Sequence, residues 1–243
     1  MLLRIAILLI LFFQSSAFAR PIISGISTNK INIDSNFTGQ EILLFGAKGD
    51  VGDIIVIVRG PKKNYIINKK AEVFGIWHNQ KRIEFDDVYS YYSFFSTSDE
   101  LKNQKLLKNL QIGQKNIELQ IPKKEREADK INFRIQLIKK MGQDNLYSEN
   151  SDNIEFLDET LFKVMLTFPK NIARGEYLVE IYLIDDGNLT AFQAIPIYVN
   201  QVGFSAKIND MAYYNSFLYA VIALLLAITA GFVANIVFSK LFK

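Results

Sequence analysis

The single histidine is the first residue of this sequence that could do catalytic chemistry. His78 directly follows Trp77, and three carboxylates come soon after it: Glu84, Asp86 and Asp87. One of these carboxylates could orient the imidazole as a general base. A hydrolase would also need a nucleophile, and the serines that follow lack a Gly-x-Ser-x-Gly elbow. We therefore expect no enzymatic activity.

Composition limits metal and cofactor chemistry. Cys 0 and His 1 exclude a disulfide framework, a thiolate zinc site and a multi-histidine metal site. Asp185, Asp186 and Asn188 could bind calcium, but they lack the longer loop of ligands that such sites use. Asp186 and Gly187 instead form a dipeptide typical of a tight β-hairpin. We expect no cofactor and no metal.

The richest aromatic stretch covers residues 89–95 and includes Tyr91 and Tyr92. Aromatic side chains on both faces of one strand favour a position in the core. The alternative is a stacking surface for a sugar or for an apolar side chain of a partner. For that alternative the candidate ligand or partner surface comprises Trp77, His78, Tyr91 and Tyr92.

Two apolar segments, one at each end of the sequence, determine where these residues lie. Residues 1–19 combine a basic start ending at Arg4, an apolar run over 5–13, and small residues at Ala17 and Ala19. This is the pattern of a signal peptide that is cleaved after Ala19. The apolar run is too short to cross a bilayer core of about 30 Å.

The second apolar segment, residues 217–238, has no charged side chain and is long enough to span a membrane as a helix of about 33 Å. Tyr213 and Tyr214 precede it as interfacial aromatics, and Lys240 and Lys243 follow it. The positive-inside rule places those lysines in the cytoplasm. We expect a transmembrane helix over 213–238 and a cytoplasmic tail over 239–243.

A stripe of small residues follows one face of this helix. Ala223, Ala227, Gly231 and Asn235 recur at steps of four, and Asn235 is the one amide on the strip. Small residues let helices approach closely, and an amide in hydrocarbon gains by hydrogen-bonding a neighbour. The stripe predicts a helix-packing interface, either with a second copy of the chain or with another membrane protein.

The segment between the two ends, residues 20–210, carries no net charge. Of the 28 basic residues, 25 lie there, together with all 25 acidic residues. This balance argues against nucleic acid as a partner. Alternation and turn signals predict strands over 41–46, 53–59, 64–68, 73–77, 89–95, 161–168, 177–184 and 190–199.

Helical spacing interrupts the strands over residues 98–142. Thr97 and Glu100 form a capping-box pattern at its start, and a stripe that includes Ile131 and Ile135 predicts a second helix over 123–141. Later in the chain, Tyr177 follows a glycine turn like the tyrosine before the sixth strand of immunoglobulin-like domains. We expect an immunoglobulin-like antiparallel β-sandwich with this helical insertion; two small sandwiches are the alternative.

Several segments of the chain match a known family: residues 33–46, 58–61, 75–77 and 161–163, with Pro169, Gly175 and Tyr177. On these segments the chain resembles a family of alphaproteobacterial transmembrane proteins. It implies a Gram-negative inner membrane and a periplasmic domain. The family has no established activity, so no functional residue is carried over. Relatives encoded near permeases of the sulfite-exporter type suggest an accessory role beside a transporter.

These observations together favour a membrane-anchored periplasmic interaction module that is an accessory subunit of an inner-membrane transporter or envelope complex. The protein would be single-pass, with its C-terminus in the cytoplasm. Two alternatives from other classes stay open. One is a periplasmic hydrolase with Ser or Asp chemistry, and the other is a periplasmic ligand sensor.

Overall fold

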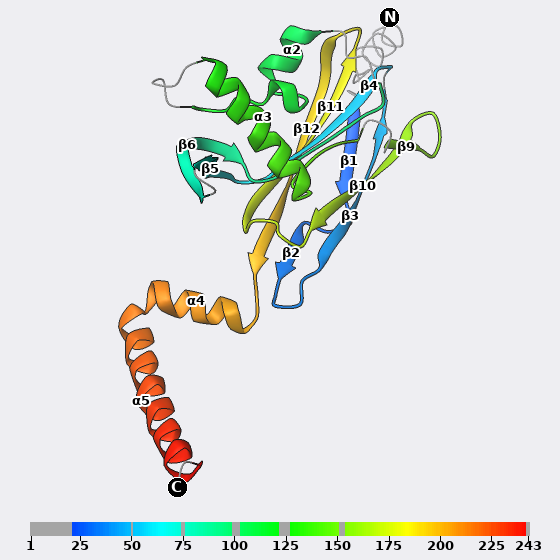
Figure 1. The fold of residues 1–243 in the computed structure, drawn as a ribbon. Helices are drawn as coiled ribbons and strands as arrows, with labels where there is room; N and C mark the ends of the chain where they lie inside the picture. Colours follow the sequence, from blue (N-terminus) through cyan, green and yellow to red (C-terminus); the bar gives the residue numbers. More distant parts are fainter. Residues whose placement is uncertain are drawn as a thin grey trace, which may run out of the picture.

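The computed structural model describes residues 21–49, 51–73, 76–98, 103–121, 127–150 and 154–241 (Figure 1). Within these ranges the protein is mainly β, with two facing sheets, a two-stranded ribbon, short covering helices, and one long C-terminal helix. The mainly β prediction and the single C-terminal apolar helix are confirmed. The expected signal peptide, residues 1–19, lies outside the described residues.

The four-stranded sheet has one face in the core and one face bare. Its strands pair antiparallel in the order β1-β3-β10-β9. They are β1 (Ile22–Ile26), β3 (Gly39–Lys48), β9 (Ile154–Phe156) and β10 (Leu161–Pro169). Along β10 buried and more accessible residues alternate strictly. This alternation is typical of an antiparallel sheet with one buried face.

The six-stranded sheet has the order β2-β12-β11-β4-β7-β8. Its strands are β2 (Lys30–Ile33), β4 (Asp53–Arg59), β7 (Tyr92–Ser96), β8 (Tyr147–Asn150), β11 (Gly175–Asp185) and β12 (Asn188–Gln201). The pairs at its two edges, β2 with β12 and β7 with β8, are parallel. The other pairs of both sheets are antiparallel, as predicted, so the structure departs from that prediction only in these two edge pairs.

Strand β4 explains why this sheet differs from the first. Six consecutive residues, Ile54 to Arg59, are buried. A strand that is buried on both faces shows a continuous apolar run instead of alternation. One face of β4 meets the other sheet, and its other face lies under the helical insertion.

Two turns show how the strands are joined. Asp186 and Gly187 both have positive φ angles, 46° and 80°, and close the β11–β12 hairpin, so that prediction is confirmed. The glycine-rich loop after β3 instead connects the two sheets. A separate ribbon pairs β5 (Lys62–Val73) with β6 (Ile76–Tyr89). Instead of the single strand expected over 73–77, Val73 ends β5 and Ile76 begins β6, and residues 74–75 lie outside the described residues.

The helical insertion contains α2 (Gln104–Asn109), η1 (Gln114–Asn116) and α3 (Glu127–Gln143). The side chain of Asn103 caps α2 by accepting from the Leu106 amide, 3.1 Å away. The Thr97 hydroxyl of the predicted capping box accepts from the Ile54 amide near the start of β4. Asp99 and Glu100 lie outside the described residues.

Helix α3 buries a different face from the one its isoleucines suggest. Phe133, Leu137 and Met141 are buried, whereas Ile131 and Ile135 are 58% and 55% exposed. Both sets recur at helical spacing, so periodicity alone allowed either face. Contact with β5 and β8 selects the face that carries the larger phenylalanine.

Side-chain hydrogen bonds hold the β10–β11 connection and join β12 of one sheet to β1 of the other. The Tyr177 hydroxyl donates to the carbonyl of Ala173 at 2.8 Å, which is the contact of a tyrosine corner. Across one open side, the Gln193 amide of β12 accepts from the backbone N–H of Ser24 in β1 and donates to its carbonyl, both at 2.9 Å. The immunoglobulin-like assignment itself stays a prediction.

The C-terminal region consists of two helices. Helix α4 (Phe204–Tyr214) follows β12 closely, and α5 (Ser216–Leu241) extends away from the sandwich (Figure 1). Residues Ser216–Ser239 of α5 are long and apolar enough to cross a membrane. Tyr213 and Tyr214 end α4, so they do not belong to the apolar helix as the sequence suggested.

Candidate functional site

Tyr91 and Tyr92, two members of the expected partner surface, belong to the core. They are only 2% and 0% exposed. The Tyr91 hydroxyl donates to the carbonyl of Thr167 at 2.7 Å, and its ring stacks on Phe168 at 5.4 Å between centroids. Burial raises the pKa of Tyr91 to about 12, while a hydrogen bond with Ser93 opposes the shift. Both rings therefore lie in the core, as the aromatic pattern favoured, and the alternative that placed Tyr91 and Tyr92 on a ligand or partner surface is wrong.

Trp77 and His78 lie near the far end of the ribbon. In β6 they pair with Glu72 and Ala71 of β5. The side chains of Trp77 and His78 are outside the described part of the chain. Their role at a ligand or partner surface stays a prediction.

A buried ion pair lies on the outer face of the six-stranded sheet, and its arginine also contacts the insertion. Arg59 of β4 and Glu180 of β11 form a salt bridge, and both residues are less than 10% exposed. The Arg59 guanidinium also donates to the carbonyls of Leu110 and Gln111, at 2.6 and 3.2 Å. The Tyr182 hydroxyl donates to the same carboxylate at 3.0 Å.

Tyrosine hydroxyls extend this polar layer beneath the insertion. Tyr92 donates to the carbonyl of Gln111 at 3.1 Å and accepts from the Gly113 amide at 2.7 Å. Tyr147 donates to the carbonyl of Tyr89 at 2.7 Å, and burial, assisted by neighbouring tyrosines, raises its pKa. The chain itself supplies the partners of these tyrosine hydroxyls and of the terminal nitrogens of Arg59, so this outer face is a structural interface.

The outer face of the four-stranded sheet is open and apolar. We call it the bare face and define it by Ile23, Leu43, Phe45, Leu161 and Met165. Four of these side chains are 45% to 57% exposed, and Leu43 is half-buried.

Strand register makes the bare face continuous. Ile23 and Leu161 flank Ala47 on β3, and Met165 of β10 lies beside Leu43. Phe45 lies between these two rows, with its ring 3.2 Å from where a Cβ on Gly25 would be. A contiguous exposed apolar patch of this kind is typical of an interaction site.

Sequence reasoning missed the bare face, although a signal for it exists. Along β10, the outward positions Leu161 and Met165 are apolar where a solvated face would be polar. Lys163 lies between them, directly opposite Phe45 of β3, and pairs with Glu155 of β9 at 2.7 Å. The apolar side chains therefore border an ion pair that extends toward the β9 edge, and protein interfaces commonly combine apolar contacts with a few polar groups.

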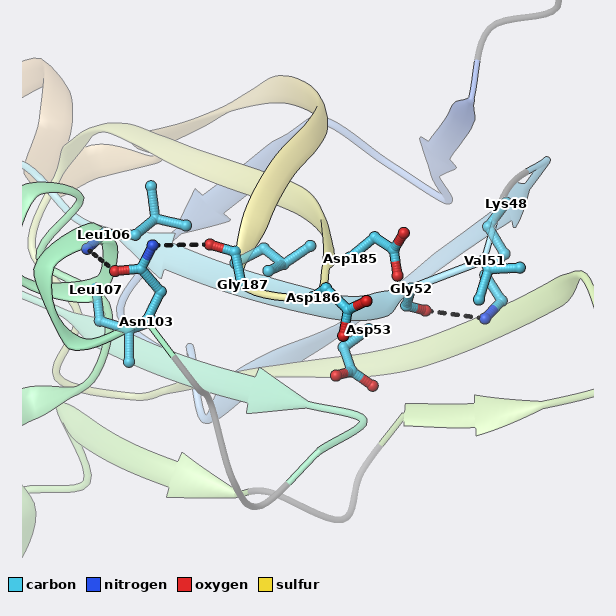
Figure 2. A pocket seen from close by; sticks show the side chains of 11 residues that line it. Lys48, Val51, Gly52, Asp53, Asn103, Leu106, Leu107, Asp185, Asp186 and Gly187 are labelled. Atoms are coloured by element: carbon cyan, nitrogen blue, oxygen red, sulfur yellow. Dashed lines mark hydrogen bonds between the residues drawn. The ribbon is translucent and has the colours of Figure 1, made fainter.

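A pocket of about 300 Å³ lies at one end of the sandwich, beside the β11–β12 hairpin (Figure 2). Two of its contacts are internal: Lys48 donates to the carbonyl of Gly52 at 3.0 Å, and Asn103 donates to that of Gly187 at 2.9 Å. Asp53 and Asp185 are among its carboxylates. In the described chain, however, no group of three acidic, histidine or cysteine side chains could hold a metal.

The predicted stripe on the C-terminal helix lies on α5. Ala223, Ala227, Gly231 and Asn235 are exposed, and a Cβ added at Gly231 would meet nothing within 4 Å. Ala223 also lines a groove between α4 and α5. The packing interface stays a prediction.

The fold and the apolar helix define a class, that of mainly β proteins anchored in a membrane by one C-terminal helix. The chain belongs to the family described as "Putative transmembrane protein (Alph_Pro_TM)", whose family model matches residues 21–240.

Further comparisons add little to this assignment. No curated protein matches the sequence. Among solved structures, the chain is similar to one from work described as the structural basis of T cell specificity and activation by the bacterial superantigen toxic shock syndrome toxin-1. That similarity has 7% identity and a TM-score of 0.27, and covers 74% of this chain and 99% of the other. At this level of similarity it supports no inference about fold or function.

Proposed function

We propose that the protein is a membrane-anchored periplasmic interaction module and an accessory subunit of an inner-membrane transporter or envelope complex. The observation that carries the proposal is the bare face, whose apolar residues lie side by side on three strands of a rigid sheet. The protein would act by binding, with the sheet as a preformed docking surface.

The anchor determines which partners can reach this surface. A domain joined to α5 by one short helix stays close to the membrane, so its most accessible partners are other proteins of that membrane. The family resemblance makes a sulfite-exporter-type permease the first partner to examine. A second copy of the chain is the other occupant that the experiment below distinguishes.

The stripe on α5 supplies a second contact within the bilayer. Small residues at Ala227 and Gly231 would let a partner helix approach closely, and Asn235 would hydrogen-bond across the interface. One contact through the bare face and a second through α5 would together hold the domain beside its partner more firmly than either contact alone.

Site-specific photo-crosslinking in intact membranes tests the proposal. A photoreactive residue at Met165 should capture one or a few membrane proteins, whereas the same residue at Lys139, exposed on α3, should capture none of them. Mass spectrometry of each adduct separates a second copy from a transporter or envelope protein. If positions 165 and 139 gave the same adducts, or if neither gave any, the proposal would be wrong.

A second variant tests the helix contact separately. Gly231→Leu together with Asn235→Leu should weaken the cross-link formed at Met165, because bulk replaces the small strip and the amide is lost. The matched control is Leu225→Ile, an exposed position on the same helix. Equal cross-linking by both variants would remove the stripe from the proposal.

A further inference from the structure

Helix α4 is joined to the apolar helix without a flexible linker. Asn215 is the single residue between them, and its amide donates to the carbonyl of Met211 at 3.0 Å. Its own carbonyl accepts from the amide of Tyr219 at 3.0 Å. Backbone hydrogen bonding therefore continues through the bend from one helix into the next.

The length of α5 determines the height of this bend relative to a bilayer. Its 24-residue apolar segment, Ser216–Ser239, measures about 36 Å, whereas a hydrocarbon core is about 30 Å thick. Ser216 therefore lies at headgroup level when α5 spans the membrane. Because only Asn215 intervenes, the end of α4 lies at headgroup level as well.

The inner side of the bend is an apolar groove of about 460 Å³. Ile208 and Met211 of α4 line it, opposite Tyr219, Ile222 and Leu226 of α5. Since these residues of α5 belong to its membrane-spanning part, the groove opens toward the bilayer. Lys207 stands at its rim, where a long side chain can keep its charge among lipid headgroups.

The side of α4 that faces away from the groove carries polar side chains. Asp210 is exposed and lies about 200° around the helix from Ile208. Tyr213 and Tyr214, at the end of α4, are 75% and 84% exposed, and tyrosine is enriched where a membrane meets water. An apolar side toward the bilayer and a charged side away from it describe an interfacial amphipathic helix.

We propose that α4 lies on the membrane surface, with lipid acyl chains of the adjacent leaflet filling the groove between α4 and α5. The lipid surface thus becomes a binding partner of the protein, and α4 determines the height and tilt of the sandwich above it. Val202 and Gly203 form the connection to β12, and the Val202 amide donates to the carbonyl of Ile33 in β2 at 2.8 Å. The inference rests on α5 spanning the membrane and is independent of any protein partner.

Single-cysteine labelling of the full chain tests this inference, since the sequence contains no cysteine that must first be removed. Ile208→Cys, Asp210→Cys and Leu225→Cys are labelled with an environment-sensitive fluorophore. Each is reconstituted into phosphatidylethanolamine–phosphatidylglycerol vesicles with or without lipids that carry a quencher near the top of the acyl chain. Leu225, well inside α5, reports whether the helix spans the bilayer at all.

The expected result is lipid quenching at position 208 that is at least about twofold stronger than at position 210, because an interfacial helix buries only its apolar face. Equal quenching at 208 and 210, or none at 208, would overturn the inference. A Leu225 label shielded from aqueous quenchers in those same vesicles would show that α5 spans the bilayer even if α4 does not lie on it. Dilution with unlabelled protein leaves the pattern unchanged if lipid, and not a second copy, fills the groove.

Discussion

The outer faces of the two sheets differ in what covers them. On the six-stranded sheet, the outward positions of β4 and β11 are buried under the helical insertion and include a charged pair, Arg59 and Glu180. On the four-stranded sheet, the outward positions of β3 and β10 include the exposed apolar side chains of Phe45, Leu161 and Met165, together with the polar residues Glu41, Lys163 and Thr167. One face thus buries charge, whereas the other exposes apolar surface.

This difference indicates that the outer face of the six-stranded sheet serves stability and that the bare face serves binding. A buried arginine is tolerated where a carboxylate and carbonyls accept from its terminal nitrogens, as Glu180, Leu110 and Gln111 do for Arg59. These contacts favour one arrangement of the helical insertion over the sheet. Exposed apolar side chains such as Met165 gain little from folding, because they stay in water until a partner removes them from it. Substitutions on the first face should therefore change folding, and those on the second should change association.

The largest effect is expected at the charged pair. Arg59→Met should lower the free energy of unfolding by about 3 to 5 kcal/mol, because Glu180 would be left charged and buried. The double variant Arg59→Met with Glu180→Leu should recover most of that loss, since no unpaired charge remains. Denaturant unfolding of the detergent-solubilised chain measures both. A double variant as unstable as the single one would contradict this account of the covered face.

The next largest loss of stability is expected in helix α2, part of the insertion that covers the six-stranded sheet. Leu107 of α2 is 6% exposed, and Leu107→Ala should cost about 2 to 4 kcal/mol through lost burial and the cavity left behind. The same unfolding measurement applies. A cost below about 1 kcal/mol would mean that α2 contributes little to covering the sheet.

A pH dependence tests the burial of Tyr91 in the core. Tyr91 titrates at 10.0 when unfolded and at about 12 when folded, so between these values the unfolded chain loses the proton first. Rising pH then favours unfolding, by about 1.4 kcal/mol per pH unit for this tyrosine. Tyr91→Phe should make the loss of stability between pH 10 and 12 shallower. An unchanged slope would contradict the burial of this hydroxyl, and the variant at pH 8 serves as the control for its lost hydrogen bond.

The smallest effect on stability is expected on the bare face. Met165→Ala should change the free energy of unfolding by no more than about 0.5 kcal/mol, as is usual for surface positions. Met165→Asp should nevertheless reduce cross-linking from a photoreactive residue at Leu161, which lies on the same face of β10. A large loss of stability from Met165→Ala would remove the contrast between the two faces.

The features that the sequence predicted correctly are those determined by residues close together in the chain. The hairpin at Asp186 and Gly187 was predictable because a tight turn with positive φ angles restricts residue choice strongly. The apolar C-terminal helix was predictable because no other structure needs so long an uncharged run.

Features that depend on distant segments were not predictable. The parallel edge pairs arise from contacts between strands far apart in sequence, such as β2 with β12. The isoleucines and the phenylalanine of α3 offered two faces at the same period, and only packing against β5 and β8 decided between them. The bare face required register across three strands, which no single segment contains.

The connection between β12 and α4 has a mechanical consequence. Only Val202 and Gly203 separate the last residue of β12 from the helix, so a force between the membrane and a protein held on the bare face enters the domain along β12. That strand is paired along its length with β11, from Asn188 opposite Asp185 to Val199 opposite Gly175. Its hydrogen bonds lie across the direction of pulling and share the load together instead of opening one after another. The anchor is thus attached to a strand that is held along most of its length by its neighbour β11.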